Sequence, residues 1–157
     1  FRSAAGFANQ ATSDRADDGL ALTDAYIAAS VRCAPPDNKP TLVEIETCLA
    51  HLEAEFAALP NVRLVLVLGR IAYDAYRRFA ARTGVKLPAA PFAHGHLVRA
   101  SSLTPGGATR SRGTLPDVIQ SYHPSRQNTH TGRLTDAMLA DVFQLARRTL
   151  DAPAALP

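Results

Sequence analysis

The apolar run at residues 62–68 (VRLVLVL) constrains the fold of this chain more than any other feature. From residue 64 onward the run contains only Leu and Val, so a strand here would have two apolar faces. Such strands are typical of parallel sheets, in which helices cover both faces. Gly69 then provides a tight turn into a helix, expected to end at Gly84, that presents to the sheet Ile71, Ala75, Tyr76 and Phe79.

A similar unit precedes this strand. Residues 24–32 (DAYIAASVR) are a second strand-like run, and the pair Thr41 and Glu44 has the pattern of a capping box, which predicts a helix that begins just after Pro40. Apolar residues then recur three or four positions apart on one helical face: Leu42, Ile45, Leu49, Leu52, Phe56 and Leu59. Strand, helix and strand in this order predict a right-handed crossover.

The alternation of strands and helices continues to the end of the chain. Residues 92–100 and 117–122 are strand candidates, and the loop 101–116 between them is rich in Gly, Pro and Ser. Thr135 is the expected N-cap of a last helix, with Leu134 and Leu139 as a hydrophobic staple. One face of that helix carries Met138, Val142, Phe143, Ala146 and Leu150.

These elements predict an α/β protein, a three-layer α/β/α sandwich with a mostly parallel central sheet. We expect one domain over residues 1–150 and a frayed tail over 151–157. Residues 1–7 have the pattern of a helix end broken at Gly6, without a preceding element. The chain is therefore expected to begin inside a domain.

Neither a long apolar run of about 18 residues nor a signal-peptide pattern is present. A soluble, cytoplasmic, monomeric protein without a membrane partner is the expectation. Although the whole chain has a formal charge of +3, residues 99–133 alone contain five arginines and a single acidic residue, Asp117. Such a segment suits a polyanion such as DNA, and a solvated arginine-rich loop is the alternative.

In parallel α/β folds, ligands bind beyond the carboxyl ends of the strands. The site is therefore expected in the loops after Val31, Leu68 and Tyr122. The first loop contains Cys33, and Cys48 lies on the next helix, at the border of its apolar face. The two thiols could share a ligand, or one could be a small core residue and the other incidental. Two thiolates are too few for a closed zinc or iron-sulfur site, which needs four ligands.

The third loop, residues 121–135 (SYHPSRQNTHTGRLT), places His123 at the end of an apolar strand. Polar residues that can contact phosphates follow it, namely Ser125, Arg126, Gln127, Asn128 and Arg133. The imidazole could face a ligand, or His123 could be structural, as a lone histidine often is.

Taken together, the motifs RCAPPDNKP (residues 32–40) and YHPSRQNTHTGRLT (residues 122–135), with strand VRLVLVLG and segment FAHG between them, resemble the iron-sulfur uracil-DNA glycosylases, especially family 5. The resemblance covers about residues 6–147. It implies a 4Fe-4S cluster held by four cysteines, of which Cys33 and Cys48 correspond to the second pair. The first pair and the glycine-rich motif that positions water are not in this sequence.

The resemblance also implies roles for individual residues. His123 corresponds to the histidine that contacts uracil O2, and residues 125–128 to the loop that enters the minor groove beside the extruded nucleotide. Where family 4 enzymes have an Asn that recognises uracil, this chain has Ala29, which favours the broader family 5 pocket. Asn38 is a further polar candidate for catalysis. Arg126 and Arg133 would hold flanking phosphates, and Gln127 or Asn128 would fill the vacated space.

The implied activity is hydrolysis of the N-glycosidic bond of uracil, with hypoxanthine and other deaminated bases as further substrates, at the start of base excision repair. The partner is DNA that contains such bases. Two rival interpretations are a non-catalytic damage-binding protein of the same fold and a zinc-stabilised nucleotide-binding module.

Overall fold

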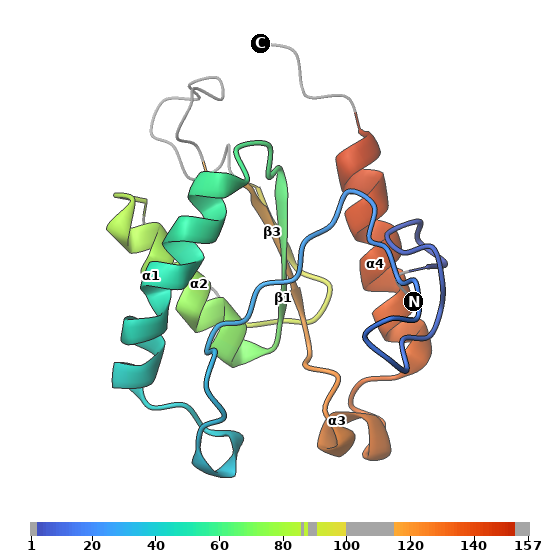
Figure 1. Cartoon of the computed structure of the whole chain (residues 1–157), viewed down its shortest axis with the longest axis horizontal. Helices are drawn as coiled ribbons and strands as arrows, with labels where there is room; N and C mark the ends of the chain where they lie inside the picture. The colour runs from blue at the N-terminus through green and yellow to red at the C-terminus, as the bar shows by residue number, and fades with distance from the viewer. Residues whose placement is uncertain (1–2, 86, 88–90, 100–114, 153–157) are drawn as a thin grey trace.

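The computed structural model describes residues 3–85, 87, 91–99 and 115–152, with the side chain of Asn38 excepted. Two helices, α1 (Leu42–Ala58) and α2 (Arg70–Arg82), lie on one side of a small sheet, and α4 (Asp136–Asp151) lies on the other (Figure 1). The sheet consists of β1 (Leu64–Leu68), β2 (Leu97–Val98) and β3 (Asp117–Ser121), and two short helices complete the fold, η1 (Pro36–Asn38) and α3 (Arg126–His130). The predicted α/β/α layering is confirmed.

The strand order is β1-β3-β2. β1 runs parallel to β3, with Leu64 opposite Asp117 and Leu68 opposite Ser121, whereas β2 is antiparallel to β3. Over the described residues the sheet is therefore mixed, and its longer pairing is the parallel one. The parallel register brings the carboxyl ends of β1 and β3 to the same edge, where the predicted site residues follow.

Side chains of β1 alternate between two cores, as the unbroken Leu and Val run predicts. Val65 and Val67 pack into the cluster formed with α1 and α2, and Leu64 and Leu66 pack into the cluster formed with α4. The aromatic part of the first cluster comes from both helices, with the Phe56 and Phe79 rings stacked at 4.4 Å. Both faces of the sheet are covered, which requires apolar residues at successive positions.

The predicted helix starts are confirmed by their caps. Thr41 Oγ1 accepts a hydrogen bond from the Glu44 N–H at 3.2 Å, and Glu44 Oε2 accepts one from the Thr41 N–H at 2.6 Å. Thr135 Oγ1 accepts one from the Met138 N–H at 3.2 Å. These side chains satisfy backbone donors that have no partner within the helix.

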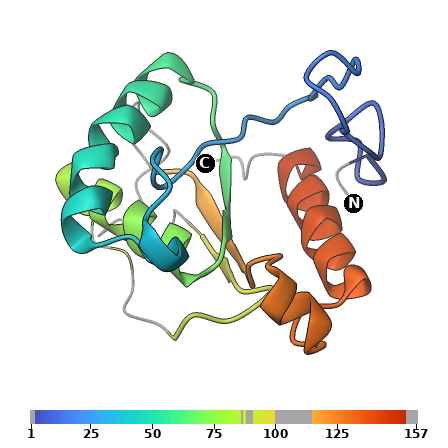
Figure 2. The ribbon, with the colours of Figure 1, turned by 60° about the horizontal axis from the view of Figure 1, so that its bottom comes forward.

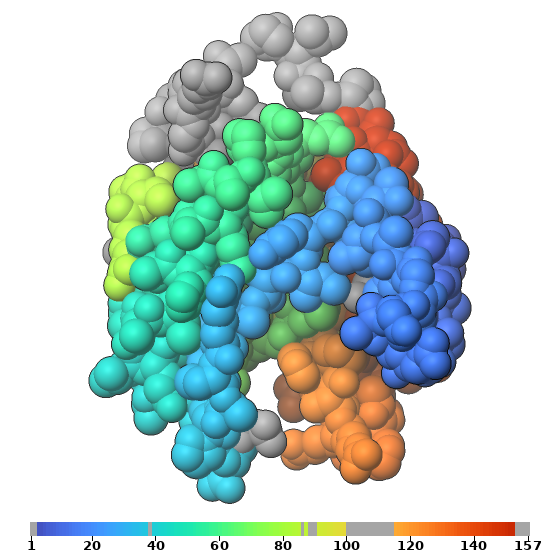
Figure 3. Space-filling view, viewed as in Figure 1, coloured from blue at the N-terminus to red at the C-terminus, as the bar shows by residue number. Residues whose placement is uncertain are grey.

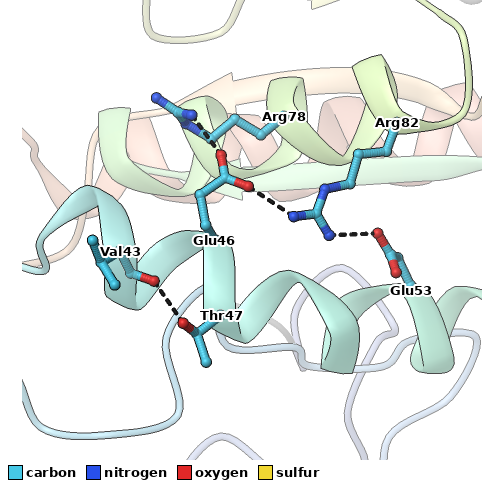
Figure 4. A network of polar contacts seen from close by, with 6 residues as sticks. All are labelled: Val43, Glu46, Thr47, Glu53, Arg78 and Arg82. Atoms are coloured by element: carbon cyan, nitrogen blue, oxygen red, sulfur yellow. Dashed lines mark hydrogen bonds and ion pairs between the residues drawn. The ribbon is translucent and has the colours of Figure 1, made fainter.

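Ion pairs join α1 to α2 on their outer surface (Figure 4). Glu46 contacts Arg78 at 2.6 Å and Arg82 at 2.8 Å, and Arg82 also contacts Glu53 at 2.9 Å. The hydrogen bond from Arg78 holds the pKa of the Glu46 carboxyl below its usual value. Because these side chains are partly exposed, water and salt screen the pairs, and they fix the helix pairing less than the aromatic core does.

Several sequence predictions are wrong in detail. Residues 24–32 form no strand and pair with no described strand, so the first crossover unit is not formed. Residues 3–6 are a turn rather than a helix end. Of the predicted strand 92–100 only Leu97–Val98 is a strand, although Gly95 and His96 also make backbone hydrogen bonds with Gln120. Position 100 lies outside the described residues, as does most of the loop 101–116. Two residues assigned to buried helix faces are exposed, Leu42 and Ile71.

The failure at residues 24–32 has a physical reason. The segment is extended but exposed, with Tyr26 and Ile27 retaining 58% and 61% of their accessible surface. A strand is stabilised by backbone hydrogen bonds to a neighbour, and no described residue lies in pairing position beside it. No helix in the described part of the chain is both long and apolar enough to cross a membrane.

Candidate active site

The candidate site begins where β1 and β3 end side by side. The Gly69 N–H donates to the Ser121 carbonyl at 2.7 Å, which extends the pairing by one step. Gly69 has a φ of +100°, and a Cβ added there would lie 2.9 Å from Cβ of His123. Only glycine fits this backbone and this close approach. The glycine after β1 therefore makes room for the histidine after β3.

His94, from the FAHG segment, fixes the backbone just before His123. Its Nδ1 accepts a hydrogen bond from the Tyr122 N–H at 3.2 Å, which places the ring proton on Nε2, and Nε2 lies 3.3 Å from the Met138 carbonyl oxygen. The imidazole thus links the end of β3 to the first turn of α4. The sequence alone gave His94 no role. Its signal in the sequence is its position directly before a glycine in the FAHG segment, and in the structure Gly95 has a φ of +75°.

The loop after His123 is held by its own polar side chains. Ser125 is the N-cap of α3 and accepts from the Asn128 N–H at 3.4 Å. Asn128 Nδ2 donates to the His123 carbonyl at 2.8 Å, and the Asn128 carbonyl accepts from the Leu134 N–H at 3.0 Å. Because Leu134 is buried, the loop is anchored at both ends. Asn128 shapes the loop, while the side chains of His123 and Gln127 remain exposed.

The family model described as the uracil DNA glycosylase superfamily matches residues 2–147, nearly the whole chain. The chain belongs to the uracil DNA glycosylase superfamily. The resemblance inferred from the two loop motifs is thereby confirmed, and the fold agrees with it.

Relatives in this superfamily include proteins named type-5 uracil-DNA glycosylase. The one from Thermus thermophilus is 44% identical over 131 residues, which are 83% of this chain and 53% of that protein. The one from Mycobacterium bovis is 38% identical over 145 residues, which are 92% of this chain and 49% of that protein. The Pyrobaculum aerophilum protein is 36% identical over 141 residues. The chain spans about half the length of these relatives.

One cavity lies between the segment 24–32 and the loop after β3. Ala29 and Ser30, from that segment, and His123 and Pro124, from the third predicted loop, line this cavity of about 1430 Å³, together with Leu68 at the end of β1. Ala29 and His123 thus lie on the same cavity. No described residue of the first predicted loop, after Val31, is among its lining residues. Asn38 falls in η1, and its side chain lies outside the described residues.

The basic residues predicted to bind DNA have different surroundings. Arg126, on α3, is exposed, and its side chain has no ion pair or hydrogen bond among the described residues. Arg133 is also exposed, and its guanidinium carbon lies 4.9 Å from the centre of the Tyr122 ring. Arg99 instead pairs with Asp117 at 3.0 Å, and Arg110 and Arg112 lie outside the described residues. The loop 121–135 therefore exposes two cations, Arg126 and Arg133, within ten residues of His123 in the sequence.

Cys33 and Cys48 are both free thiols, the first exposed and the second half-buried on α1. The described residues contain no group of three or more histidine, cysteine or acidic side chains that could hold a metal ion. A four-cysteine cluster needs two further thiolates. The described residues alone therefore do not form a complete cluster site.

Proposed function

We propose that this chain carries the histidine half of the active site of a DNA-repair glycosylase, which hydrolyses the N-glycosidic bond of uracil and related deaminated bases in DNA. The observation that carries the proposal is His123, exposed at the end of β3 and fixed through Gly69, His94 and Asn128. Relatives named type-5 uracil-DNA glycosylase support the same activity. A monomer that acts on DNA in the cytoplasm is the setting this activity implies.

The reaction requires the base to leave the stack, because the reacting carbon is inaccessible inside a duplex. When the bond between the sugar carbon and the base nitrogen breaks, both electrons go to the base, and negative charge develops on its carbonyl oxygens. An N–H of His123 directed at such an oxygen stabilises that charge without reorganisation, since the loop already holds the histidine backbone. Water then adds to the sugar carbon, and the proton that this water loses goes to the departed base, directly or through solvent. We propose no described residue for positioning the water.

The loop around His123 supplies the remaining contacts. Arg126 and Arg133 would neutralise phosphates that flank the extruded nucleotide. Gln127, exposed on α3, would occupy the space that the base leaves. Asn128 would act mainly through the loop, because its amide already donates to the His123 carbonyl. Asn38 remains a proposed polar residue of the pocket.

Single-turnover excision from a uracil-containing duplex at saturating full-length enzyme tests the role of His123. His123→Ala should lower the rate by about 10²-fold or more while DNA affinity changes little, because the lost donor acts on charge that appears in the transition state. His130→Ala is the matched control, a histidine at the end of α3 that is also exposed. Excision at the wild-type rate by a folded His123→Ala protein would refute the proposal.

Cys33 and Cys48 are proposed as two ligands of a 4Fe-4S cluster, with the other two supplied by polypeptide outside these 157 residues. They would tie the loop before η1 to the second turn of α1. The full-length protein should then be brown, and Cys33→Ser or Cys48→Ser should abolish the colour and bound iron. Elemental analysis that finds zinc, or an active colourless protein without iron, would contradict the cluster.

A further inference from the structure

A row of aromatic rings runs from α2 to the loop after β3. The Tyr73 and Phe92 ring centres lie 5.9 Å apart, and the Phe92 and Tyr122 ring centres lie 6.2 Å apart. Tyr73 is 1% exposed and Tyr122 is half-buried, so the row begins in the core and ends at the surface. Figure 2 shows the segment 91–98, which contributes Phe92 and His94, reaching the end of β3.

Tyr122 and His123 are neighbours in sequence, but their side chains have different surroundings. The Tyr122 ring lies 5.2 Å from the His94 ring, and the Tyr122 N–H donates to His94 Nδ1 at 3.2 Å. His123 instead approaches Gly69 and lines the cavity of about 1430 Å³, which Tyr122 does not line. The Tyr122 ring is therefore held by Phe92 and His94, outside the cavity that His123 faces.

The guanidinium of Arg133 lies over this ring, with its carbon 4.9 Å from the ring centre. The backbone beside Arg133 is fixed, because the next residue, Leu134, is 1% exposed and its N–H donates to the Asn128 carbonyl at 3.0 Å. A cation over an aromatic face is attracted by the electron density of the ring. The ring thus orders a side chain that would otherwise sample many rotamers.

Two other arginines of the described residues also lie over aromatic rings, and both use their N–H groups within the protein. Arg147, 4.1 Å from the centre of the Phe7 ring, donates to two backbone carbonyls and to a carboxylate. Arg77 pairs with Asp74 at 3.9 Å. Arg133 has no ion pair or side-chain hydrogen bond among the described residues. Within this part of the chain, its donors are therefore ordered by a ring and available to a ligand.

An ordered guanidinium with available donors suits a phosphate. It can direct two parallel N–H groups at two phosphate oxygens while its face stays on the ring. The loop after β3, orange in Figure 3, projects from one edge of the molecule, where an extended polyanion can reach it. Because the ring already orders the side chain, less rotamer entropy is lost on binding than for a free arginine.

We propose that Tyr122 is a positioning residue for DNA binding, and that its ring holds the Arg133 guanidinium ready for a phosphodiester group. The inference rests on the proposed function, in which Arg133 neutralises a phosphate that flanks the extruded nucleotide. His123 then acts on the base that leaves, and Tyr122 acts through Arg133 on the DNA backbone. Loss of the Tyr122 ring should therefore weaken DNA binding only where Arg133 is present.

A double-mutant cycle with the full-length protein tests this coupling. The probe is a duplex that contains 2′-fluorodeoxyuridine, which resists hydrolysis because fluorine disfavours positive charge on the sugar. Tyr122→Leu should weaken binding by about two- to fivefold, the size of an exposed cation–π interaction, and should have no effect in the Arg133→Ala background. Tyr122→Phe, which restores a ring, should recover most of the lost affinity.

Phe7→Leu is the matched control, since it removes the ring beneath Arg147, whose N–H groups are already used within the protein. It should leave the affinity for DNA unchanged. In wild type, the Tyr122 ring should also shift the NMR signals of the Arg133 side-chain protons upfield, with and without DNA. Absence of that shift would overturn the proposal even if Tyr122→Leu failed to fold.

Two further results would overturn it. The first is that Tyr122→Leu weakens binding equally with and without Arg133, as expected of a residue that only shapes the loop. The second is that Tyr122→Phe binds no better than Tyr122→Leu. Single-turnover excision of uracil by the wild-type protein separates these failures from failure of the proposed function. If wild type binds DNA and excises uracil, only the role of Tyr122 is lost, whereas a wild-type protein that does neither would overturn both.

Discussion

The loop after β3 and the segment 24–32 lie at the same cavity but differ in how the chain holds them. The loop is fixed by Gly69, His94 and Asn128, all from described elements of the same chain. The segment is extended and exposed, and it is tethered by polar surface contacts, through Tyr26 and Arg32 to Glu55 and through Asp24 to Arg147. One region has its neighbours within the described chain, and the other does not.

This difference between the two regions shows that local sequence can specify a loop but not the pairing of a strand. A loop can be built by caps, a glycine and short side-chain hydrogen bonds, which act over a few residues. A strand cannot, because its backbone groups need a second strand. The loop after β3 is therefore held by hydrogen bonds within the chain, whereas residues 24–32 have no paired strand. Substitutions in the two regions should differ in their effects on stability and on excision.

The largest effect is expected at Gly69. Its φ of +100° and ψ of 164° fall in a region that is essentially restricted to glycine, where another residue costs about 1–3 kcal/mol. Gly69→Ala also places a Cβ 2.9 Å from Cβ of His123. We expect a lower melting temperature and single-turnover excision reduced by about tenfold or more in the full-length protein.

Gly132→Ala is the matched control for Gly69→Ala. Gly132 also has a positive φ, +69°, and an added Cβ there would meet nothing within 4 Å. This variant should lose stability through backbone strain but keep its excision rate. If both glycine variants excise uracil equally well, the contact between Gly69 and His123 does not position the histidine, and the ordered loop is less dependent on β1 than we propose.

The sequence predicts the three long helices and the strands β1 and β3 well, because their signals are local, whereas the short helices η1 and α3 lie in segments that the sequence predicts as loops. The capping box at Thr41, the N-cap at Thr135 and the unbroken apolar run of β1 each specify an element whose partners are present. Residues 24–32 have the same strand-like composition, and yet they do not pair. Composition indicates that a segment can be a strand, whereas pairing depends on a neighbour that the segment itself does not encode.

The candidate site could be predicted only in part. His123 and its loop follow from the motif, but the contacts that hold them join residues far apart in sequence, such as His94 to Tyr122 and Gly69 to His123. No spacing rule gives such contacts. Charge in the sequence can also mislead. Arg99 belongs to the basic segment that suits DNA, but in the structure it forms an ion pair with Asp117.

A smaller effect is expected from the exposed cations of the ordered loop. If Arg126 neutralises one phosphate, Arg126→Ala should reduce the slope of log affinity against log salt by about one unit, whatever the DNA sequence. Arg148→Ala is the control, an exposed arginine on α4, on another part of the surface. Equal slopes for wild type and Arg126→Ala in a DNA-binding titration would show that Arg126 neutralises no phosphate and is simply solvated.

The smallest effect is expected in the unpaired region. Oε1 of Glu55 accepts hydrogen bonds from both Tyr26 and Arg32, so Glu55→Ala should release residues 24–32 from α1. A partly exposed ion pair of this kind contributes less than about 1 kcal/mol. We expect faster cleavage within residues 24–32 in limited proteolysis and an almost unchanged melting temperature, because no core residue depends on this segment.

Glu46→Ala, also on α1, should do the opposite. It removes the ion pairs to Arg78 and Arg82, so it should lower the melting temperature slightly without changing proteolytic cleavage within residues 24–32. Because the folded state holds the pKa of Glu46 below its usual value of 4.5, its stabilisation is complete above that pH and is lost as the pH falls through the lower, folded pKa. The difference between Glu46→Ala and wild type should therefore disappear in acid. If instead Glu55→Ala destabilises the whole chain more than Glu46→Ala at neutral pH, residues 24–32 are part of the cooperative core, and the contrast between the two regions fails.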